Sequence, residues 1–434
     1  MHRRYITILA VLTCLVSWAI TPREEFARDK RRSAYCYVVY PDKDLPALTP
    51  APRGYVPFHI DHYGRHGSRW LTNARAYSDP IEILEMGARN GRLTAKGQEI
   101  LSQLKVLNEA SQNRWGELTP LGAEQHRGIA ERMMRNFPQV FAGDAIINAR
   151  STTKIRCILS MSNELQVFSA RNPRITIDCD ASAADMYYLK SEPRELIDSL
   201  VKPAMPQLLD LMKAEIDFSH FHSQLFNDPQ FVADSIAPAD LVGKMYELAS
   251  NMQSHSEMDM SFYDLFTVDE LYGIWNKFNT WNYVYLAACP QSGSACPYVT
   301  GVPLLRNIIA SCDAAIASGN QGATLRFGHD TVIMPTVCLM GLDWYGAQVS
   351  DMSKVSDEWQ NYRIFPMAAN LQMVFYRHAE GKTSPSDILV KFLYNEYEAT
   401  LPISAVEGPY YRWNDVKSYF ENILAMSPYK ALGY

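Results

Sequence analysis

The pattern of apolar and polar residues along the chain changes from that of strands to that of helices and then back again. Bulky and polar residues alternate over 55–62, which is the period of a strand. Short apolar runs at 145–150, 174–179 and 323–328 have the length of further strands. Between 181 and 303 the pattern is helical and contains almost no strand. The sequence therefore predicts an α/β fold that is interrupted by a long helical segment.

Helical periodicity places helices between these strands and throughout the middle segment. Thr119 followed by Pro120 is a typical helix start, and Thr267 with Glu270 has the spacing of a capping box. Near the end of the chain, runs at 368–377 and 388–395 flank a short loop and predict a β-hairpin. The predicted helices cover 92–112, 119–135, 194–215, 238–252, 267–287 and 304–317.

These elements group into two parts of unequal size. A chain of 434 residues exceeds the size at which one hydrophobic core usually stops growing. We expect a large α/β domain with a central, mostly parallel sheet, formed by residues 55–180 and 304–434. Residues 181–303 would form a smaller helical insertion, or cap, domain. Residues 20–54 contain a charged run followed by closely spaced prolines, and we interpret them as a solvated lead-in.

The first residues have the features of an export signal. Basic and histidine residues at positions 2–4 precede an apolar run over 5–20, which is short for a membrane span. We interpret residues 1–19 as a signal peptide and expect an exported protein, in the periplasm, on the cell surface or outside the cell. No membrane span is expected after cleavage, and an uncleaved anchor is the alternative interpretation.

Seven cysteines follow this signal, which is an odd number. At least one thiol would therefore stay unpaired in an oxidising compartment. Cys289 and Cys296 flank a short loop and are the best candidates for a disulfide.

Composition and charge limit the kinds of partner that the protein can bind. Hydrophobic residues make up 47% of the chain, charged residues 20%, and the net charge is -6. Such a chain is typical of soluble globular proteins and has no basic excess that would favour nucleic acid. We expect a monomer that acts on a small molecule, with any positive site confined to a local pocket.

The candidate chemistry is concentrated where the first predicted strand ends. Arg65 and Arg69 flank His66, and Gly64 and Gly67 allow sharp backbone turns. Arginine binds phosphoryl oxygens through forked donors that are always charged. A histidine between two fixed cations is held neutral near neutral pH, which leaves one ring nitrogen nucleophilic. The motif predicts an anion site that contains a nucleophile.

The motif Arg65-His66-Gly67-x-Arg69 at the end of an early strand resembles the signature of the histidine phosphatase superfamily. The chain is similar to the acid phosphatase and phytase branch over most of residues 55–402. This resemblance implies a hydrolase that removes phosphate from phosphate esters through a phosphohistidine at His66, without a metal or other cofactor. Phytate and other inositol phosphates are the expected substrates, and a broad-specificity acid phosphatase is the alternative.

Arg150 is the third arginine that we expect at this site. It ends the apolar run that starts at 145, and binding sites of open α/β sheets lie beyond the carboxyl ends of the strands. The resemblance also implies a phosphate-binding Arg in a similar Arg-Ser-Thr context. The sequence leaves open whether Lys154 or Arg156 points inward. His126, in the predicted helix 119–135, is expected to be a helix-surface or packing residue.

Two motifs compete for the role of proton donor. His329 and Asp330 lie between a predicted strand and a predicted helix, as the resemblance implies for a His-Asp pair. His378-Ala379-Glu380 matches the corresponding motif of multiple inositol polyphosphate phosphatases but lies at the tip of the predicted hairpin. We therefore assign the proton donor to Asp330 and a supporting donor to His329. A carboxyl acid predicts an acidic pH optimum.

Three other kinds of protein share parts of this pattern. A metallohydrolase would use His59, Asp61, His62 and His329, but strand alternation points His62 away from the other two residues of its strand. A phosphotransferase or mutase would form the same phosphohistidine, but the export signal argues against a role in the cytosol. A binding protein without activity would not need the complete set of reactive residues.

Overall fold

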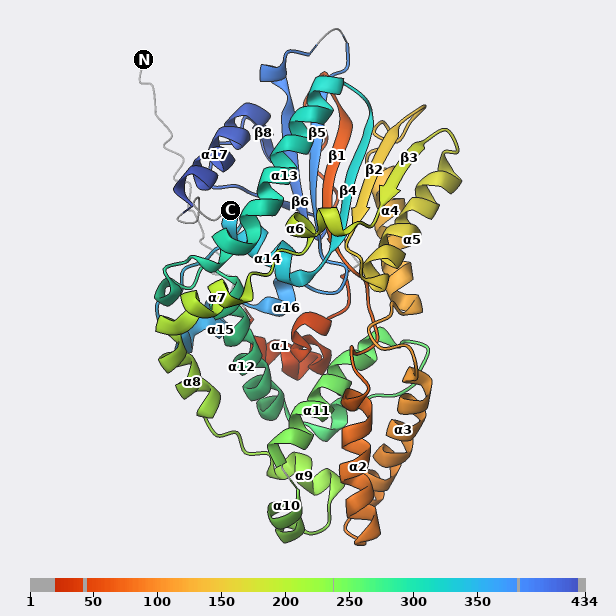
Figure 1. The fold of residues 1–434 in the computed structure, drawn as a ribbon, viewed down its shortest axis with the longest axis vertical. Helices are drawn as coiled ribbons and strands as arrows, with labels where there is room; N and C mark the ends of the chain where they lie inside the picture. Colours follow the sequence, from red (N-terminus) through yellow and green to blue (C-terminus); the bar gives the residue numbers. More distant parts are fainter. Residues whose placement is uncertain (1–19, 42–44, 237, 381–382, 428–434) are drawn as a thin grey trace, which may run out of the picture.

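A single mixed sheet forms the centre of the upper half of the molecule in Figure 1. The structure is a computed structural model that describes residues 20–41, 45–236, 238–380 and 383–427. Its strands pair in the order β3-β2-β4-β1-β5-β6-β7, and β8 pairs with β6. The strands are β1 (Tyr55–Arg65), β2 (Ile146–Ser151), β3 (Thr176–Asp180), β4 (Gly322–Gly328), β5 (Asn370–His378), β6 (Leu389–Tyr394), β7 (Tyr397–Ala399) and β8 (Tyr410–Arg412).

The directions of the strands confirm the predicted α/β fold class, with β1 to β4 forming the parallel part of the sheet. β1 runs parallel to β4, and β2 runs parallel to both β3 and β4. β5 is antiparallel to β1 and forms the predicted hairpin with β6. The carboxyl ends of β1, β2 and β4 therefore lie at one edge of the sheet, where side chains that follow them meet.

Helices cover both faces of this sheet (Figure 1). α13 (Cys296–Ser318), α14 (Asp330–Leu339) and α17 (Trp413–Met426) share an apolar cluster with β5 and β6. α4 (Pro120–Asn136) and α5 (Ile155–Arg171) pack on the opposite face, against apolar side chains of β1, β2 and β4. α13 is long and apolar enough to cross a membrane by length and composition. More than half of its most apolar 18-residue stretch is buried inside the protein, however, so it packs as a core helix.

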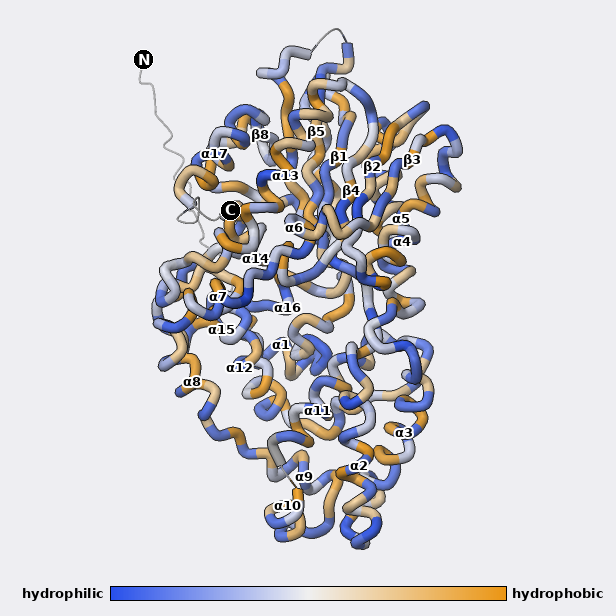
Figure 2. The backbone as a smooth tube through the Cα atoms, in the orientation of Figure 1, coloured by the Kyte–Doolittle hydropathy of each residue, from blue (hydrophilic) through white to orange (hydrophobic). Residues whose placement is uncertain are grey.

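The lower half of the molecule in Figure 1 is helical. α2 and α3 share one apolar cluster with α9, α11 and α12, so residues 75–111 pack with helices of the expected insertion rather than on the sheet. Figure 2 shows hydrophilic and hydrophobic positions alternating along α2 and α3, as in helices with one buried face. The remaining helices are α1 (Pro22–Arg28), α2 (Arg75–Arg89), α3 (Ala95–Ser111), α6 (Met186–Leu189), α7 (Arg194–Val201), α8 (Met205–Lys213), α9 (Ser219–Leu225), α10 (Pro229–Ser235), α11 (Pro238–Asn251), α12 (Val268–Leu286), α15 (Val355–Glu358) and α16 (Asn361–Ile364).

Within the segment predicted to be a solvated lead-in, several side chains are instead buried in the core. Phe26 of α1 is fully buried, and its ring lies edge-on to Trp275 of α12 with the centroids 5.1 Å apart. Ala34, Tyr37 and Val38 are buried as well. Phe26 is the one aromatic residue of this short helix, and most of its neighbours are charged. Seven residues are too few to show the periodicity that predicts a buried face.

The two cysteines that were expected to pair are separate thiols in the structure. The Cys289 thiol donates to the side-chain oxygen of Gln291, and the Cys296 thiol points to the carbonyl of Val284. Both side chains are buried, and each has a local acceptor of its own. The predicted signal peptide, residues 1–19, lies outside the described residues.

Candidate active site

The signature turn is held in place by the main chain of two neighbouring strands. The His66 N–H donates to the Gly328 carbonyl at the end of β4 over 3.0 Å. The His66 carbonyl accepts from the Ala368 N–H, and the Arg65 N–H donates to the Ala369 carbonyl, just before β5. Segments far apart in the chain thus fix the backbone of the turn on both sides.

The side of the turn that faces α4 and α5 is packed backbone against backbone. A Cβ atom at Gly67 would lie 2.4 Å from the Gly122 carbonyl oxygen of α4, so only glycine fits there. The Ser68 carbonyl accepts from the N–H of Thr119, and the Gly67 N–H donates to the Ser160 hydroxyl of α5. Contacts with α4 and α5 therefore fix the conformation of the turn on this side.

His66 is buried and has one ring nitrogen available for chemistry. Its Nδ1 lies 2.9 Å from the Gly67 carbonyl oxygen, and because that oxygen can only accept, Nδ1 carries the proton. Nε2 is left with a lone pair. Burial lowers the pKa of His66 well below its ordinary value, and the charges of Arg156 and Arg65 lower it further. The ring is therefore neutral and nucleophilic, as the flanking arginines predicted.

Arg65 is anchored on three sides. Its Nη1 donates to the carbonyls of Cys36 and Phe365 at 2.7 Å each, and its Nη2 lies 2.8 Å from a carboxylate oxygen of Asp330. Arg69 lies against the ring of Tyr37, with its guanidinium carbon 5.1 Å from the ring centroid. Both arginines are thus pre-oriented by groups from the N-terminal segment, which the sequence pattern had not indicated.

Arg150 does not join this cluster, which corrects the expectation from the sequence. Its Nη2 bonds to Asp178 at 2.7 Å, and its Nε lies 4.0 Å from Asp185. The pairing of β2 with β4 sets Arg150 beside Arg326, whose guanidinium bonds to Asp61. Side chains alternate along a strand, so a strand end alone does not determine the face on which its last side chain lies.

Arg156 is the arginine that the structure brings to His66 instead. It lies in the first turn of α5, and its charge acts on His66, on Arg65 and on Arg69. Burial lowers the pKa of Arg156, and the charge of Arg69 lowers it further. The helical spacing of Arg156 with Ser160, which contacts the same turn, is the sequence signal that marks this face of α5.

The three arginines share an unusual feature. The Nε atoms of Arg65, Arg69 and Arg156 are all buried, and none has a hydrogen-bond acceptor within the described part of the chain. Buried donors without acceptors are rare in folded proteins, and three charged ones around one histidine are a site prepared for an anion.

His329 and Asp330 lie where β4 passes into α14, as predicted. The rings of His329 and His66 lie edge to face with centroids 5.6 Å apart, and Nε2 of His329 is 3.3 Å from the Thr152 hydroxyl. Burial opposes ionisation of Asp330, but the charges of Arg65 and Arg69 outweigh it and hold the pKa of this carboxyl below its ordinary value. Burial also lowers the pKa of His329, to about 3, so its ring is neutral.

The competing motifs lie elsewhere. His378 pairs with Tyr55, the first residue of β1, at the end of the sheet opposite to His66. The following Glu380 is exposed. Asp61 is bonded to Arg326, whereas the ring nitrogens of buried His62 have no hydrogen-bond partner among the described residues. In the ranges that the structure describes, no group of three His, Cys, Asp or Glu side chains is arranged to hold a metal ion.

Comparison with known proteins identifies the family to which this fold and site belong. The model of the histidine phosphatase superfamily (branch 2) matches residues 64–395, and the chain belongs to this superfamily. The family resemblance predicted from the signature motif is thereby confirmed, and so is the prediction that the protein is a phosphatase.

The chain is similar to named phosphatases in sequence and in fold. Multiple inositol polyphosphate phosphatase 1 of Gallus gallus is 23% identical over 409 residues, which cover 87% of this chain and 84% of that protein. The multiple inositol polyphosphate phosphatase of Bifidobacterium longum, solved with inositol hexasulfate, has a similar fold, with a TM-score of 0.71, 20% identity and coverage of 89% of this chain and 97% of that one. The phytase from D. castellii gives a TM-score of 0.61 at 16% identity, covering 92% and 86%.

Proposed function

We propose that this protein hydrolyses phosphate monoesters of inositol through a phosphohistidine at His66, with Asp330 as proton donor. The observation that carries the proposal is the set of three buried Nε atoms of Arg65, Arg69 and Arg156 around the neutral ring of His66. A phosphoryl group has the oxygens that these donors lack, and fixed donors of this kind stabilise the charge that develops during transfer.

The first step forms a nitrogen–phosphorus bond. The free Nε2 of His66 attacks phosphorus in line, while the bond between phosphorus and the ester oxygen breaks and its electron pair leaves with that oxygen. Asp330 supplies the proton that converts the departing alkoxide into an alcohol. A water molecule then attacks the phosphohistidine, gives a proton to Asp330, and releases inorganic phosphate and the neutral histidine.

Substrate binding prepares Asp330 for this role. In the free site Arg65 and Arg69 lower the pKa of the Asp330 carboxyl. A phosphoryl dianion that binds these arginines offsets their charge and adds its own negative charge beside the carboxyl, which raises its pKa toward the working range. The enzyme should therefore be most active in mildly acidic solution, where substrate binding and protonation of Asp330 occur together.

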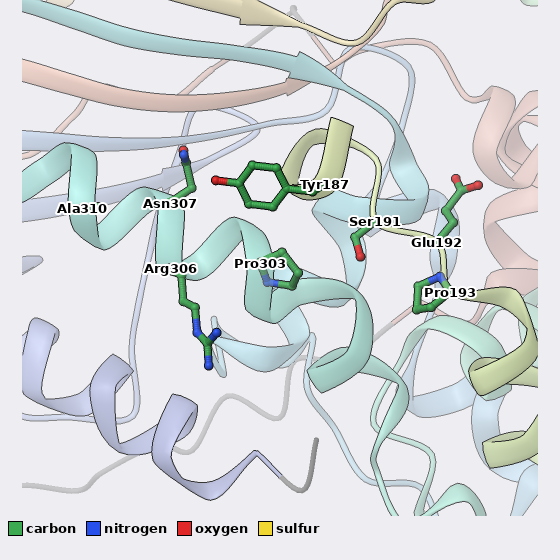
Figure 3. Close-up of a pocket in the computed structure, with 8 residues that line it drawn as sticks. All are labelled: Tyr187, Ser191, Glu192, Pro193, Pro303, Arg306, Asn307 and Ala310. Atoms are coloured by element: carbon green, nitrogen blue, oxygen red, sulfur yellow. The ribbon is translucent and has the colours of Figure 1, made fainter. Parts of the chain in front are cut away.

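The alcohol part of the substrate would lie along the loop that follows α6. Lys190 acts on His329 by its charge and pairs with Glu192 at 3.3 Å. Glu192 lines a cavity of about 580 Å³, with Arg306 on its opposite side (Figure 3). A cation near His329 and another across this cavity suit an alcohol that carries further phosphates, as inositol phosphates do. The names of the relatives support the same class of substrate.

One observation favours the alternative, a phosphatase of broad specificity. The Glu192 carboxylate accepts from the Thr331 hydroxyl at 2.7 Å, next to Asp330, and would repel a second phosphate placed there. Hydroxyl groups of sugars or lightly phosphorylated inositols would meet this carboxylate favourably. Lys190 and Glu192 thus act in opposite directions on a highly charged substrate.

The test measures phosphate release from phytate, from inositol phosphates with fewer phosphates, and from aryl and sugar phosphates. We expect kcat/KM to be highest for inositol phosphates, and His66→Ala to abolish both turnover and an acid-labile phosphoenzyme labelled from substrate. Turnover or phosphoenzyme that persists in His66→Ala would overturn the mechanism. Equal kcat/KM for all esters would favour the alternative of broad specificity.

Export is a separate part of the proposal. It rests on the residues at positions 2–4 and the apolar run over 5–20. Expression of the full chain in a secreting host, followed by N-terminal sequencing of the product, tests it. A mature protein that starts close to residue 20 supports cleavage, and a membrane-bound protein that keeps residue 1 would contradict it.

A further inference from the structure

The hydroxyl of Tyr63 makes two main-chain hydrogen bonds beside the catalytic cluster. Tyr63 lies in β1, three residues before His66, and only 1% of its surface is exposed. Its oxygen accepts the N–H of His329 at 3.1 Å, and its proton goes to the Leu189 carbonyl at 2.9 Å. One side chain of the nucleophile's strand therefore touches both the proton-donor turn and the loop that carries Lys190.

The Tyr63 hydroxyl also restricts the residue type at position 328. A Cβ atom at Gly328 would lie 2.0 Å from the Tyr63 oxygen, so the hydroxyl fills the space in which a side chain at 328 would stand. Gly328 is also the residue whose carbonyl accepts from the His66 N–H. The end of β4 is thus held to the end of β1 by the main chain at His66 and by the Tyr63 side chain.

The direction in which the chain leaves β4 determines where the Asp330 carboxyl lies. The N–H of His329 precedes α14 and has no carbonyl of an earlier helical turn to bond to, so it depends on an outside acceptor. Tyr63 supplies that acceptor. Two residues after His329, the N–H of Thr331 donates to a carboxylate oxygen of Asp330 at 3.0 Å. The carboxyl is therefore oriented from both sides, by Tyr63 through His329 and by Thr331.

We propose that Tyr63 is a positioning residue for proton transfer, which keeps the Asp330 carboxyl aligned with the leaving oxygen of the substrate. This inference rests on the proposed role of Asp330. Tyr63 does not touch the phosphoryl group and takes part in no bond change. Its hydroxyl selects one orientation of the turn between His329 and Asp330, and it ties that turn to the loop at Leu189 on the side where the alcohol leaves.

The proposal is tested by comparing substrates that differ in their need for a proton. An alkyl phosphate must receive a proton from Asp330 as its phosphorus–oxygen bond breaks, whereas p-nitrophenolate leaves as an anion without one. In Tyr63→Phe we expect kcat/KM for the alkyl ester to fall about 10-fold or more and that for the p-nitrophenyl ester to fall less than about 3-fold. A uniform loss of folded enzyme lowers both values equally and leaves their ratio unchanged.

Tyr283→Phe is the matched control. Tyr283 of α12 is fully buried, accepts the Val349 N–H at 2.6 Å and donates to the Ala347 carbonyl at 3.1 Å, the same pair of contacts away from the reacting groups. The Tyr283→Phe variant should lower the stability of the protein as Tyr63→Phe does, but it should leave the ratio of alkyl to aryl turnover unchanged. If Tyr63→Phe gives no soluble protein, Gly328→Ala displaces the same hydroxyl from the other side and should show the same selective loss.

Asp330→Asn separates failure of this inference from failure of the proposed function. A selective loss on alkyl esters in Asp330→Asn, together with an unchanged ratio in Tyr63→Phe, would overturn the role of Tyr63 alone. If Asp330→Asn itself loses alkyl and aryl turnover equally, the assignment of the proton donor is wrong and the inference falls with it. Selective loss in both variants, and an unchanged ratio in the Tyr283 control, is the expected result.

Discussion

Replacement of Arg156 by alanine is the substitution that most directly tests the arrangement of the site. Its guanidinium lies with those of Arg65 and Arg69 around His66, and its buried Nε has no protein acceptor. Loss of one fixed donor to developing charge costs about 3–4 kcal/mol in the transition state, or roughly 100-fold to 1,000-fold in rate. We expect kcat/KM to fall by that amount.

The stability of the Arg156→Ala variant should not fall with its activity. Burial and the charge of Arg69 both lower the pKa of Arg156, so the charged form of Arg156 is destabilised in the folded protein. Removing it relieves repulsion, as is common where catalytic groups are stored in a strained arrangement. The midpoint of thermal unfolding, measured by calorimetry without phosphate, should be unchanged or higher. A large decrease would mean that Arg156 serves the fold.

The pH dependence of the same variant gives a second readout. Arg156 is one of the charges that lower the pKa of His66, so its removal moves that pKa upward. His66 is active when neutral, and its protonation on the acid side would therefore begin at a higher pH. The acid limb of the kcat/KM profile should shift to higher pH in Arg156→Ala.

Arg150→Ala is the matched control for these measurements. The Arg150 side chain is 30% exposed and pairs with Asp178, which is more exposed, so its loss should change the free energy of unfolding by about 1 kcal/mol or less. We expect kcat/KM to stay within about 2-fold of the parent. A 100-fold loss in Arg150→Ala, with little loss in Arg156→Ala, would refute the reasoning and restore the assignment made from the sequence.

Three further substitutions test other parts of the structure. Asp330→Asn should remove the alkaline decline of kcat for alkyl phosphates, because no carboxyl then loses its proton as pH rises; an unchanged limb would contradict its role. Gly67→Ala should inactivate the enzyme, since the added Cβ meets the Gly122 carbonyl at 2.4 Å, and full kcat would show that the turn is loose. Phe26→Ala should destabilise the protein by about 3–5 kcal/mol in denaturant unfolding, against less than about 0.5 for exposed Val106→Ala.

The parts of the fold that could be predicted from the sequence are those with a strong local pattern. The strand that ends at Arg65, the capped helix that begins at Pro120 and the hairpin of β5 and β6 each have alternation, capping residues or turn residues of their own. The position of α1 could not be predicted, because its buried face is a single phenylalanine that packs on a helix more than 200 residues later. Long-range packing of this kind leaves no local signal.

The residues of the site also divide into those that the sequence predicts and those that it does not. Arg65, His66 and Arg69 follow one another in the chain, and the turn at His329 and Asp330 has its strand and helix beside it. The sequence contains both Arg150 and Arg156 but does not show which of them lies at the site. That depends on which face of β2 packs toward α5. Strand register and the face on which each side chain lies are set by the assembled sheet, and the sequence of a single strand does not determine them.

The way in which the signature turn is supported has a consequence for the time at which activity arises during synthesis. His66 is made early, but its main chain is bonded to Gly328 and Ala368, and Arg65 bonds to the carbonyl of Phe365. A nascent chain that ends before these residues contains the complete signature but lacks the support that β4 and the segment before β5 give it. We therefore expect the proposed nucleophile to be inactive while most of the chain is translated, and phosphatase activity to begin only after the last third has joined the sheet.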